Sequence, residues 1–322
     1  MTKGSTSGYQ DRDDGLHPFK GEGYYEWWYF DARFDNGYSC VLTWHWRNAF
    51  LKPHIPTIQI FTYTPDGKRH IGLAAMEPEE CTAREDRCEV WMGESFARQE
   101  DAAYRIKMHA KGVGAELVFR NRLPGWKPVS GFVHHDKAAE QGWVIAVPRG
   151  EVEGKLYIGD EVVPVKGRGY HDHNWGNVNM YDSFRGWYWG RLFDPTYTLI
   201  YAWMLPLKEG EPSLPSLYLA KGDTPILTTD QLEFIVEKEE VDEVTGKSTA
   251  RDILLKSRGE GDVQFQCRLN TKRVIESGRL PKVTDWPQYN WRFLADYKAE
   301  IKIGDVVDKV SGETIHECLL LR

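Results

Sequence analysis

The sequence predicts an all-β protein of two domains packed side by side, each a β-sandwich or barrel. Three observations predict this class. Apolar and polar residues alternate with a period of two through much of the 322-residue chain, as they do along strands with one buried face. Turn signals separate the alternating runs. No run shows a convincing period of 3.6 over three helical turns. A chain of this length suits about two domains.

The expected strands are rich in aromatic and β-branched residues, which favour sheets. Asp35-Asn36-Gly37 and Pro65-Asp66-Gly67 supply the first turns between them. In chain order, we expect strands at 27–30, 38–46, 57–63, 115–120, 142–147, 154–158, 186–193, 198–204, 216–220, 232–236, 252–255, 264–269, 290–303 and 316–321. Many strands of similar spacing indicate barrels or sandwiches.

The division expected from these patterns has three parts. Residues 1–20 lack an apolar core and read as a flexible N-terminal segment, residues 21–182 as the first β domain, and residues 183–322 as a β-barrel domain. The seam falls near 177–185, and the remaining part of about 140 residues suits one barrel of eight to ten strands. The charge run at 233–243 reads as a solvated hairpin.

Composition excludes several classes of function. The net charge of −7 and the lack of a dense basic cluster argue against nucleic acid as a partner. No signal peptide or apolar run of about 18 residues is evident, so a soluble, cytoplasmic protein is expected. Five cysteines at irregular spacings predict buried free thiols. The 13 Trp, 16 Tyr and 13 Phe suggest ring-lined cavities or sheet faces.

The segment 170–176, Tyr-His-Asp-His-Asn-Trp-Gly, concentrates groups that can move a proton. On a strand, His171, His173 and Trp175 share one face and Asp172 and Asn174 the other. A polar corner held by hydrogen bonds is the plain structural alternative. A metal site is a third reading, for which His134-His135-Asp136 is the nearest source of a third ligand in composition. No metal is expected.

Glu26 lies in the aromatic run 25–31, where alternation places it on one face with Trp28 and Phe30. A carboxyl group among rings has its pKa raised by desolvation and can donate a proton. The alternative is an edge-strand Glu26 paired with an Arg such as Arg47.

Two further runs place indoles beside polar groups. In 43–47, Trp44 and Trp46 alternate with His45 and Arg47, and His45 reads more readily as a scaffold group than as a catalyst. In 186–193, Trp187, Trp189, Arg191 and Phe193 share a face, where indoles can hold a developing cation by about 1–2 kcal/mol. Tyr201 and Trp203 are expected to face the same interior as this stripe. No GxSxG, Walker or HExxH motif is present, so no cofactor is implied.

Together, the run Glu26-Trp27-Trp28-Tyr29-Phe30, the segment 170–176 and Gly186-Trp187-Tyr188-Trp189-Gly190 resemble the carotenoid 1,2-hydratase (CrtC)/AttH-like family. The resemblance covers the chain from about Gly21 onward. It implies two lipocalin-like β domains with a ligand cavity near their junction and no organic cofactor. The family includes isoprenoid hydratases, flavonoid hydratases and Diels–Alderase-type cyclases of natural-product pathways.

The resemblance also implies roles for residues. His173 and Trp175 match functional positions of the hydratases, and Tyr201 is the counterpart of a downstream Tyr. Trp203 stands where the family's nearby acid would, which favours a prenylated or polyketide-like substrate over a carotenoid.

Three hypotheses follow for a hydrophobic small-molecule ligand. The first is a cofactor-independent hydratase or cyclase in which Asp172 or Glu26, helped by His173 and with His171 and Tyr201 as further catalytic candidates, protonates an alkene. The substrate would lie against Trp175, Trp28, Trp44, Trp187, Trp189, Arg191, Asn174 and Trp203. The second is a pericyclic cyclase that acts by preorganisation, and the third is a carrier that does no chemistry.

Overall fold

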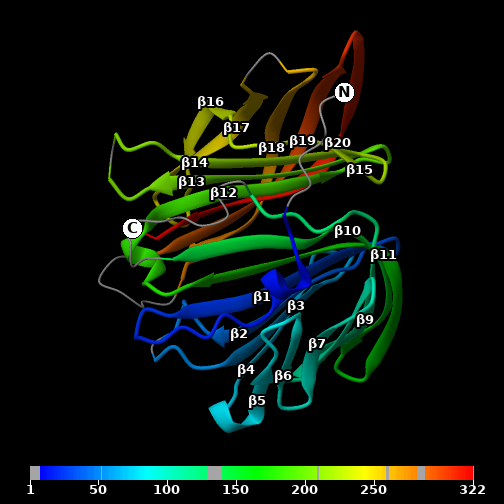
Figure 1. The fold of residues 1–322 in the computed structure, drawn as a ribbon, viewed down its shortest axis with the longest axis vertical. Coiled ribbons are helices and arrows are strands. Elements are labelled where there is room, and N and C mark those ends of the chain that lie inside the picture. Colours follow the sequence, from blue (N-terminus) through cyan, green and yellow to red (C-terminus); the bar gives the residue numbers. More distant parts are fainter. Residues whose placement is uncertain are drawn as a thin grey trace. The chain divides into compact units, whose positions relative to one another are not determined.

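A computed structural model of the chain describes residues 8–51, 53–128, 140–208, 210–258, 261–280 and 287–321. The chain divides into two compact units, Thr6–Met180 and Tyr181–Arg322. Each unit is built on one curled antiparallel sheet and has its own hydrophobic core (Figure 1). The predicted all-β class is confirmed, and no α-helix occurs among the described residues.

The first unit has an 11-stranded sheet in the order β4-β3-β2-β1-β11-β10-β9-β8-β7-β6-β5. β1 and β11 are the fourth and fifth strands in this order, so most of the conspicuous polar motifs occupy interior strands. The bounds are β1 Tyr25–Phe34, β2 Ser39–Arg47, β3 Thr57–Tyr63, β4 Arg69–Ala75, β5 Cys81–Ala83, β6 Glu89–Met92, β7 Ser95–Glu100, β8 Ala103–Ala110, β9 Val113–Asn121, β10 Gln141–Ile158 and β11 Glu161–Gly176.

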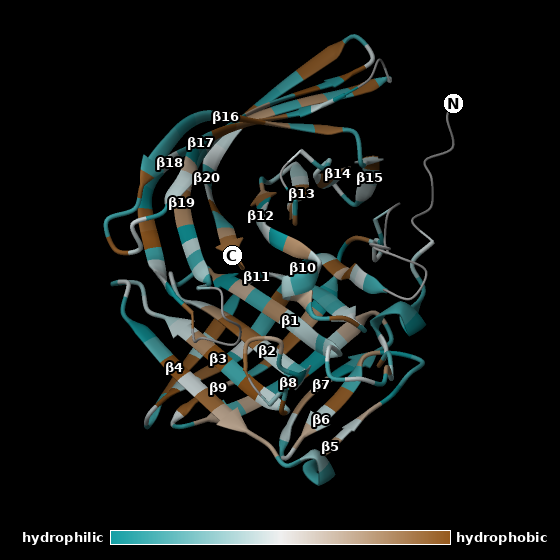
Figure 2. Cartoon of the chain, turned by 90° about the vertical axis from the view of Figure 1, so that its left-hand side faces the viewer, coloured by the Kyte–Doolittle hydropathy of each residue, from teal (hydrophilic) through white to brown (hydrophobic). Residues whose placement is uncertain are grey.

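Hydrophobic and hydrophilic residues alternate along these strands, as the banded colours of Figure 2 show, so the sheet has one apolar face. On β8, Tyr104, Ile106, Met108 and Ala110 are buried in the core, while Arg105 and His109, which lie between them, are exposed. The sheet curls so that β3 and β4 pack against β8 and β9. Gly72 permits this approach, because a Cβ there would lie 2.4 Å from the carbonyl oxygen of Ala110.

Strand β10 corrects the sequence prediction of two separate strands at 142–147 and 154–158. Pro148 and Gly150 look like breaks in the sequence, yet the strand runs through them from Gln141 to Ile158. Its pairing with β11 shifts register on both sides of Val147. Bulges of this kind accommodate a proline in an interior strand, since its missing donor falls where the ladder is already interrupted.

The second unit has a nine-stranded sheet in the order β15-β14-β13-β12-β20-β19-β18-β17-β16. Its core includes Leu199, Leu219, Trp291 and Phe293. The bounds are β12 Phe184–Phe193, β13 Tyr197–Pro206, β14 Leu214–Lys221, β15 Thr224–Thr229, β16 Leu232–Val241, β17 Ser248–Ser257, β18 Val263–Arg279, β19 Tyr289–Ile303 and β20 Val306–Leu320. The predicted solvated hairpin is confirmed: β16 is exposed from Ile235 to Val241 and turns at Asp242–Lys247.

Helical structure is confined to three short 3-10 turns, η1 Asp11–Asp14, η2 Pro78–Glu80 and η3 Met180–Asp182. The sequence prediction missed β4 to β8, β15 and the first part of β11, most of which are short or only weakly alternating. None of the described helical segments is long and apolar enough to span a bilayer.

Candidate functional site

The segment 170–176 forms the end of β11 and pairs with β1 in antiparallel register. Trp28 is opposite His173, and Phe30 is opposite His171. Because paired residues share a face, the imidazoles and Glu26 project from one side of the sheet. Asp172 lies opposite Tyr29 and projects from the other side. The structure therefore separates Asp172 from His173, which the sequence reading treated as possible partners.

Glu26 is fully buried and accepts hydrogen bonds from four donors. His173 Nε2 lies 2.9 Å and His17 Nδ1 3.2 Å from Oε1, the His17 backbone N–H donates to the same oxygen at 2.9 Å, and the Tyr24 hydroxyl donates to Oε2. Burial raises the pKa of Glu26, but the hydrogen bonds from His17 and His173 outweigh it, so the pKa is lowered. Glu26 is a carboxylate here and a poor proton donor.

This corrects two expectations for Glu26. Its pKa is lowered, where the aromatic surroundings predicted a raised one. β1 is an interior strand, not an edge, and the Arg47 Nε donates to the Tyr24 carbonyl at 3.2 Å. Sequence alone could not supply the donors, since His17 and Tyr24 precede the strand and His173 is distant in the chain.

The segment before β1, expected to be flexible up to residue 20, instead supplies the half-buried Tyr9 and His17 and the fully buried Asp14. Asp14 is fully buried: its Oδ2 lies 3.0 Å from His171 Nε2 and accepts from the Tyr104 hydroxyl at 2.8 Å. The Trp28 indole donates to the Asp14 carbonyl at 2.9 Å. Neither Asp14 nor His17 was singled out from the sequence, because no periodic pattern marks them.

The three imidazoles of this cluster are held against flat rings. His17 stacks on Trp175 at 3.7 Å, His171 on Phe30 at 3.7 Å and His173 on Trp28 at 4.4 Å between centroids. Phe30 in turn packs edge-on against Trp44 at 5.7 Å. Trp28 and Trp44, expected as substrate contacts, are fully buried core residues.

The hydrogen bonds fix the proton positions on both β11 imidazoles. His171 Nδ1 lies 2.9 Å from the Tyr29 carbonyl and must donate to it, so one proton is shared between Nε2 and Asp14. Burial lowers the pKa of His173 despite Glu26, which favours a neutral ring that donates from Nε2 to that carboxylate. His173 Nδ1 lies 3.6 Å from Asp14 Oδ1, and neither atom has a hydrogen-bond partner among the described residues.

Two sets of side chains in this cluster offer metal-ligand atoms within 4.8 Å of one another: Asp14, Cys88 and His171, and His17, Glu26 and His173. The closest imidazole–carboxylate separations, 2.9 and 3.0 Å, are ordinary N–H···O distances. Ligands of a tetrahedral zinc ion lie roughly 3.3–3.8 Å apart. Shared protons account for these contacts. The third-ligand candidates His134, His135 and Asp136 lie outside the described residues.

On the opposite face, the Asp172 carboxyl is almost completely buried. Its Oδ2 accepts from the Tyr170 hydroxyl at 2.8 Å and the Trp143 indole at 3.0 Å, and its Oδ1 accepts from the Asn174 amide at 2.9 Å. Burial raises the pKa of Asp172 to about 7, a rise that the donors from Trp143 and Tyr170 limit and the nearby Asp31 supports. An acid with this pKa is partly protonated at neutral pH.

More aromatic groups surround Asp172 than the motif alone suggested. The Tyr29 hydroxyl donates to Asp31 Oδ2 at 3.0 Å, and Trp126 packs edge-on against Trp143 at 6.0 Å. Tyr29 and Asp31 share one face because they are two residues apart on β1. Trp143 comes from β10, and only the pairing of Trp143 with Asn174 brings it to Asp172.

In the second unit, the structure groups Trp187, Trp189 and Arg191 on one half-buried face of β12. The Arg191 guanidinium lies 5.6 Å from the ring of Trp189 and 4.9 Å from that of Phe193. The Trp187 indole donates to Glu317 at 3.3 Å.

Tyr201 and Trp203 face the opposite way from this stripe, which corrects the sequence prediction. Tyr201 pairs with Gly190 and Trp203 with Tyr188, so both share the core-facing side of β12. The Tyr201 hydroxyl lies 3.3 Å from His316 Nδ1, and burial raises its pKa well above the usual range. Tyr201 is therefore separated from the indoles with which it was grouped.

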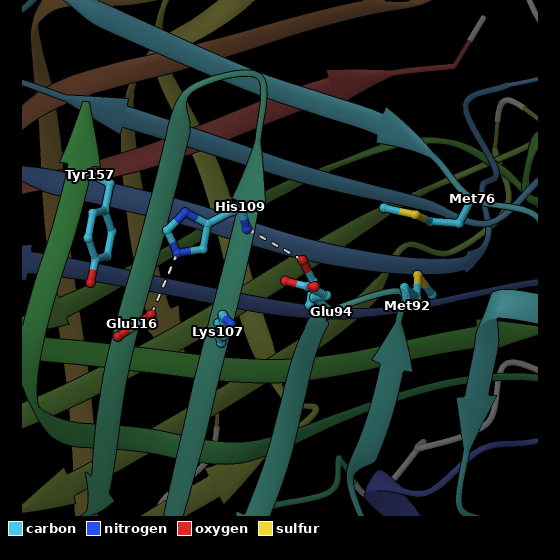
Figure 3. A pocket seen from close by; sticks show the side chains of 8 residues that line it. Met76, Met92, Glu94, Lys107, His109, Glu116 and Tyr157 are labelled. Atoms are coloured by element: carbon cyan, nitrogen blue, oxygen red, sulfur yellow. Dashed lines mark hydrogen bonds and ion pairs between the residues drawn. The ribbon is translucent and has the colours of Figure 1, made fainter. Parts of the chain in front are cut away.

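A pocket of about 520 Å³ opens elsewhere on the first unit (Figure 3). Its rim carries the His109 imidazole, 3.8 Å from Glu116, beside the Tyr157 ring. The lining residues are Met76, Met92, Glu94, Ser95, Lys107, His109, Glu116 and Tyr157, none of which was a predicted site residue.

No family model matches the chain. Among curated proteins, the hydroxyneurosporene dehydrogenase of Chlorobaculum tepidum is 31% identical, with 58% of each chain covered. The quinolone epoxide rearrangement protein asqO of Emericella nidulans is 28% identical over 34% of this chain and 31% of that protein. The chain thus matches 58% of the length of the first relative and less than a third of the second.

Solved structures match nearly the whole chain. An AttH candidate from Nitrosomonas europaea has a TM-score of 0.67 at 16% identity, covering 98% of this chain and 97% of its own. CghA with bound Sch210972 gives 0.68 at 11% identity, with 98% and 97% covered. Kievitone hydratase from Nectria haematococca gives 0.59 at 16% identity, with 99% and 93% covered. The solved structures show that this chain shares their fold, and the curated matches agree with the resemblance that the motifs indicate.

Proposed function

We propose that the protein is a cofactor-independent hydratase or cyclase that protonates an alkene of a hydrophobic isoprenoid or related natural product, with Asp172 as the proton donor. The observation that carries the proposal is the buried Asp172 carboxyl, which has a pKa of about 7 and accepts hydrogen bonds from the Trp143 indole and the Tyr170 hydroxyl. A general acid works best when its pKa is close to the working pH. The name of kievitone hydratase supports the reaction class.

The chemistry assigned to Asp172 balances without a cofactor. The carboxylic acid gives its proton to one alkene carbon, and the other carbon becomes a cation. Water or an internal nucleophile then forms a bond to that cation, and the proton lost from the nucleophile restores the acid. Since Oδ2 already accepts two hydrogen bonds, the acid proton belongs on Oδ1, which accepts from Asn174. Nearby rings stabilise positive charge.

The cluster on the other face of the sheet has a positioning role in this proposal. His171 and His173 flank Asp172 on β11, and each is hydrogen-bonded to a buried carboxylate, Asp14 or Glu26. Both neighbours of the acid are therefore held in place, which fixes the direction of its carboxyl group. His173 and Glu26 contribute to the reaction through Asp172 and not by contact with the substrate.

The test uses the origin of the transferred proton. The protein is incubated in D2O with a panel of linear isoprenoids and prenylated aromatic compounds, and products are examined by mass spectrometry for deuterium bound to carbon. Alkene protonation leaves one such deuterium in either a hydrated or a cyclised product. Asp172→Asn should lower the rate by about 10²–10⁴-fold.

The matched control is Asp160→Asn, which changes the same functional group in the exposed turn between β10 and β11. It should retain full activity. Turnover of the Asp172→Asn variant at the rate of the unaltered protein would contradict alkene protonation by Asp172. Product without carbon-bound deuterium would instead favour a pericyclic cyclase, and no turnover of any compound would favour a carrier.

A further inference from the structure

The interior of the Tyr181–Arg322 unit contains a buried cation that the proposed reaction does not use. Arg251, on β17, is 5% exposed. Its Nη2 lies 3.4 Å from Asp242 Oδ2, and its Nε lies 3.7 Å from Glu240 Oε2, beyond hydrogen-bond distance. Neither Nε nor Nη1 has a hydrogen-bond partner among the described residues. Leaving such donors unsatisfied in an interior is costly.

The Asp242 carboxylate does not accept hydrogen bonds from these two nitrogens of Arg251. Its Oδ1 accepts from the Thr245 backbone N–H at 2.9 Å and from the Thr245 hydroxyl at 2.8 Å. Asp242 balances the charge of Arg251 through one long contact, while two guanidinium nitrogens still lack acceptors. The guanidinium can therefore donate to a further acceptor, as in a binding site without its ligand.

A second donor without a hydrogen-bond partner, on His316, lies beside the Phe293 ring that also contacts Arg251. The Phe293 ring centroid is 5.0 Å from the Arg251 guanidinium and 5.0 Å from the His316 ring. His316 is fully buried, and burial, followed by the Arg251 charge, lowers its pKa to about 3, so the ring is neutral. The Tyr201 hydroxyl keeps its proton and donates to His316 Nδ1, so the remaining ring proton sits on Nε2. That atom has no partner among the described residues.

Thr249 adds a third polar group. It lies two residues before Arg251 on β17, where the pairing with β16 shifts register, and its buried hydroxyl also lacks a partner in the described part of the chain. The groups without partners are thus mainly donors, which an oxygen acceptor would satisfy together. Half-buried Trp203, Leu205 and Phe234 pack against the same core and offer apolar contact. Trp203 and Phe234 stack at 5.4 Å.

We propose that the interior of this unit binds the carboxylate of an apolar organic acid, with Arg251 as its main contact and His316 as a supporting donor. The carboxylate is the natural partner of a guanidinium because two oxygens match two N–H groups. The apolar body of the acid would lie against Trp203 and Phe234. This site is independent of Asp172, which belongs to the other unit.

The test compares an acid with its ester on the full-length protein. The probe is 11-(dansylamino)undecanoic acid, whose fluorescence reports an apolar environment, together with its methyl ester. The ester keeps the apolar body and removes the charge. The unaltered protein should bind the acid at least about tenfold more tightly than the ester. Arg251→Met should remove this preference while leaving ester affinity similar.

The matched control is Arg258→Met, which removes an exposed arginine just beyond the end of the same strand, and it should keep the preference for the acid. If Arg251→Met fails to fold because Asp242 is left unpaired, the double variant Asp242→Asn/Arg251→Met removes both charges and serves in its place. Equal binding of acid and ester by the unaltered protein would overturn the proposal. A folded Arg251 variant that still prefers the acid, or an unaltered protein that binds neither probe, would do the same.

Discussion

The raised pKa of the Asp172 carboxyl results from the loss of water around it. Two phenol or indole donors face one of its oxygens, yet burial outweighs them and raises its pKa from 3.8 to about 7. The neighbouring imidazoles of His171 and His173 lie across the sheet and contact other carboxylates. One strand therefore carries an acid kept partly protonated on one face and imidazole–carboxylate hydrogen bonds on the other.

The pH dependence of turnover follows from this pKa. Below about pH 6 Asp172 is protonated and the rate should be constant, and above about pH 8 it should fall about tenfold per pH unit as the acid form is depleted. Stability changes in the same range. The folded state holds this proton between pH 3.8 and about 7 when the unfolded chain does not, so folding loses stability as pH rises through that window.

Urea unfolding of the unaltered protein and Asp172→Asn at pH 5 and pH 8 checks this sign. The variant, which has no charge to bury, should gain in relative stability at the higher pH. A rate that rises through pH 7, or a stability difference that does not change with pH, would contradict the assignment of the raised pKa.

The contribution of Glu26 to stability depends on pH in the opposite direction. Its folded pKa is lowered, so its contribution to stability is present above the unfolded value of about 4.5 and is lost as pH falls through the lower folded value. Glu26→Gln should destabilise the protein by about 3 kcal/mol at pH 7, because breaking a buried pair leaves groups without partners. The loss should shrink below pH 4. Urea denaturation measures it, with exposed Glu22→Gln as the control.

At the scale of elements, the pairing of β12 with β13 depends on a missing side chain. A Cβ at Gly190 would lie 2.7 Å from His316 Cβ and 2.8 Å from the Tyr201 ring. Gly190→Ala should therefore cost about 1–3 kcal/mol through overpacking. Gly278→Ala is the matched control, since its nearest neighbour would be 3.8 Å away. Thermal unfolding compares the two, and equal midpoints would contradict the tight packing at Gly190.

The same pairing shows where sequence reasoning stops. Alternation within one strand correctly grouped Trp187, Trp189 and Arg191. Placing Tyr201 relative to them needed the register across the turn, and a shift of one residue reverses the face of every side chain. The composition of the turn at Asp194–Thr196 does not reveal that register.

The candidate site likewise contains some residues that could be placed from the sequence and others that could not. His171, His173 and Asp172 could be placed on their faces from the sequence because strand geometry is local. Asp14, His17 and Trp143 could not be assigned to them, since those contacts depend on how distant segments pack. The lowered pKa of Glu26 was missed for this reason: burial was foreseeable, but the donors that offset it were not.

At the scale of the whole chain, both units bury their cysteines. All five are free and buried, as the irregular spacing predicted. Burial raises the pKa of Cys81 to about 11 and that of Cys318 to about 12, and it raises those of Cys40, Cys88 and Cys267 further. The thiolate, which is the reactive form, is thus scarce at neutral pH.

An aromatic disulfide reagent such as DTNB should therefore react slowly with the native protein and release five equivalents after denaturation in guanidinium. The absorbance of the released thiolate counts them. Rapid reaction of one equivalent in the native state would contradict the burial of that cysteine, and tryptic mapping of the labelled chain would identify it.

The burial of Asp14 and the stacking of His17 on Trp175 bear on how far this chain can be trimmed. A version that starts at residue 21 would leave the Tyr104 hydroxyl and His171 without their shared acceptor, at about 1–3 kcal/mol for each stranded group. It would also uncover an indole and loosen the strand that carries Asp172. The segment before residue 21, which looks dispensable in the sequence, therefore stabilises the first sheet.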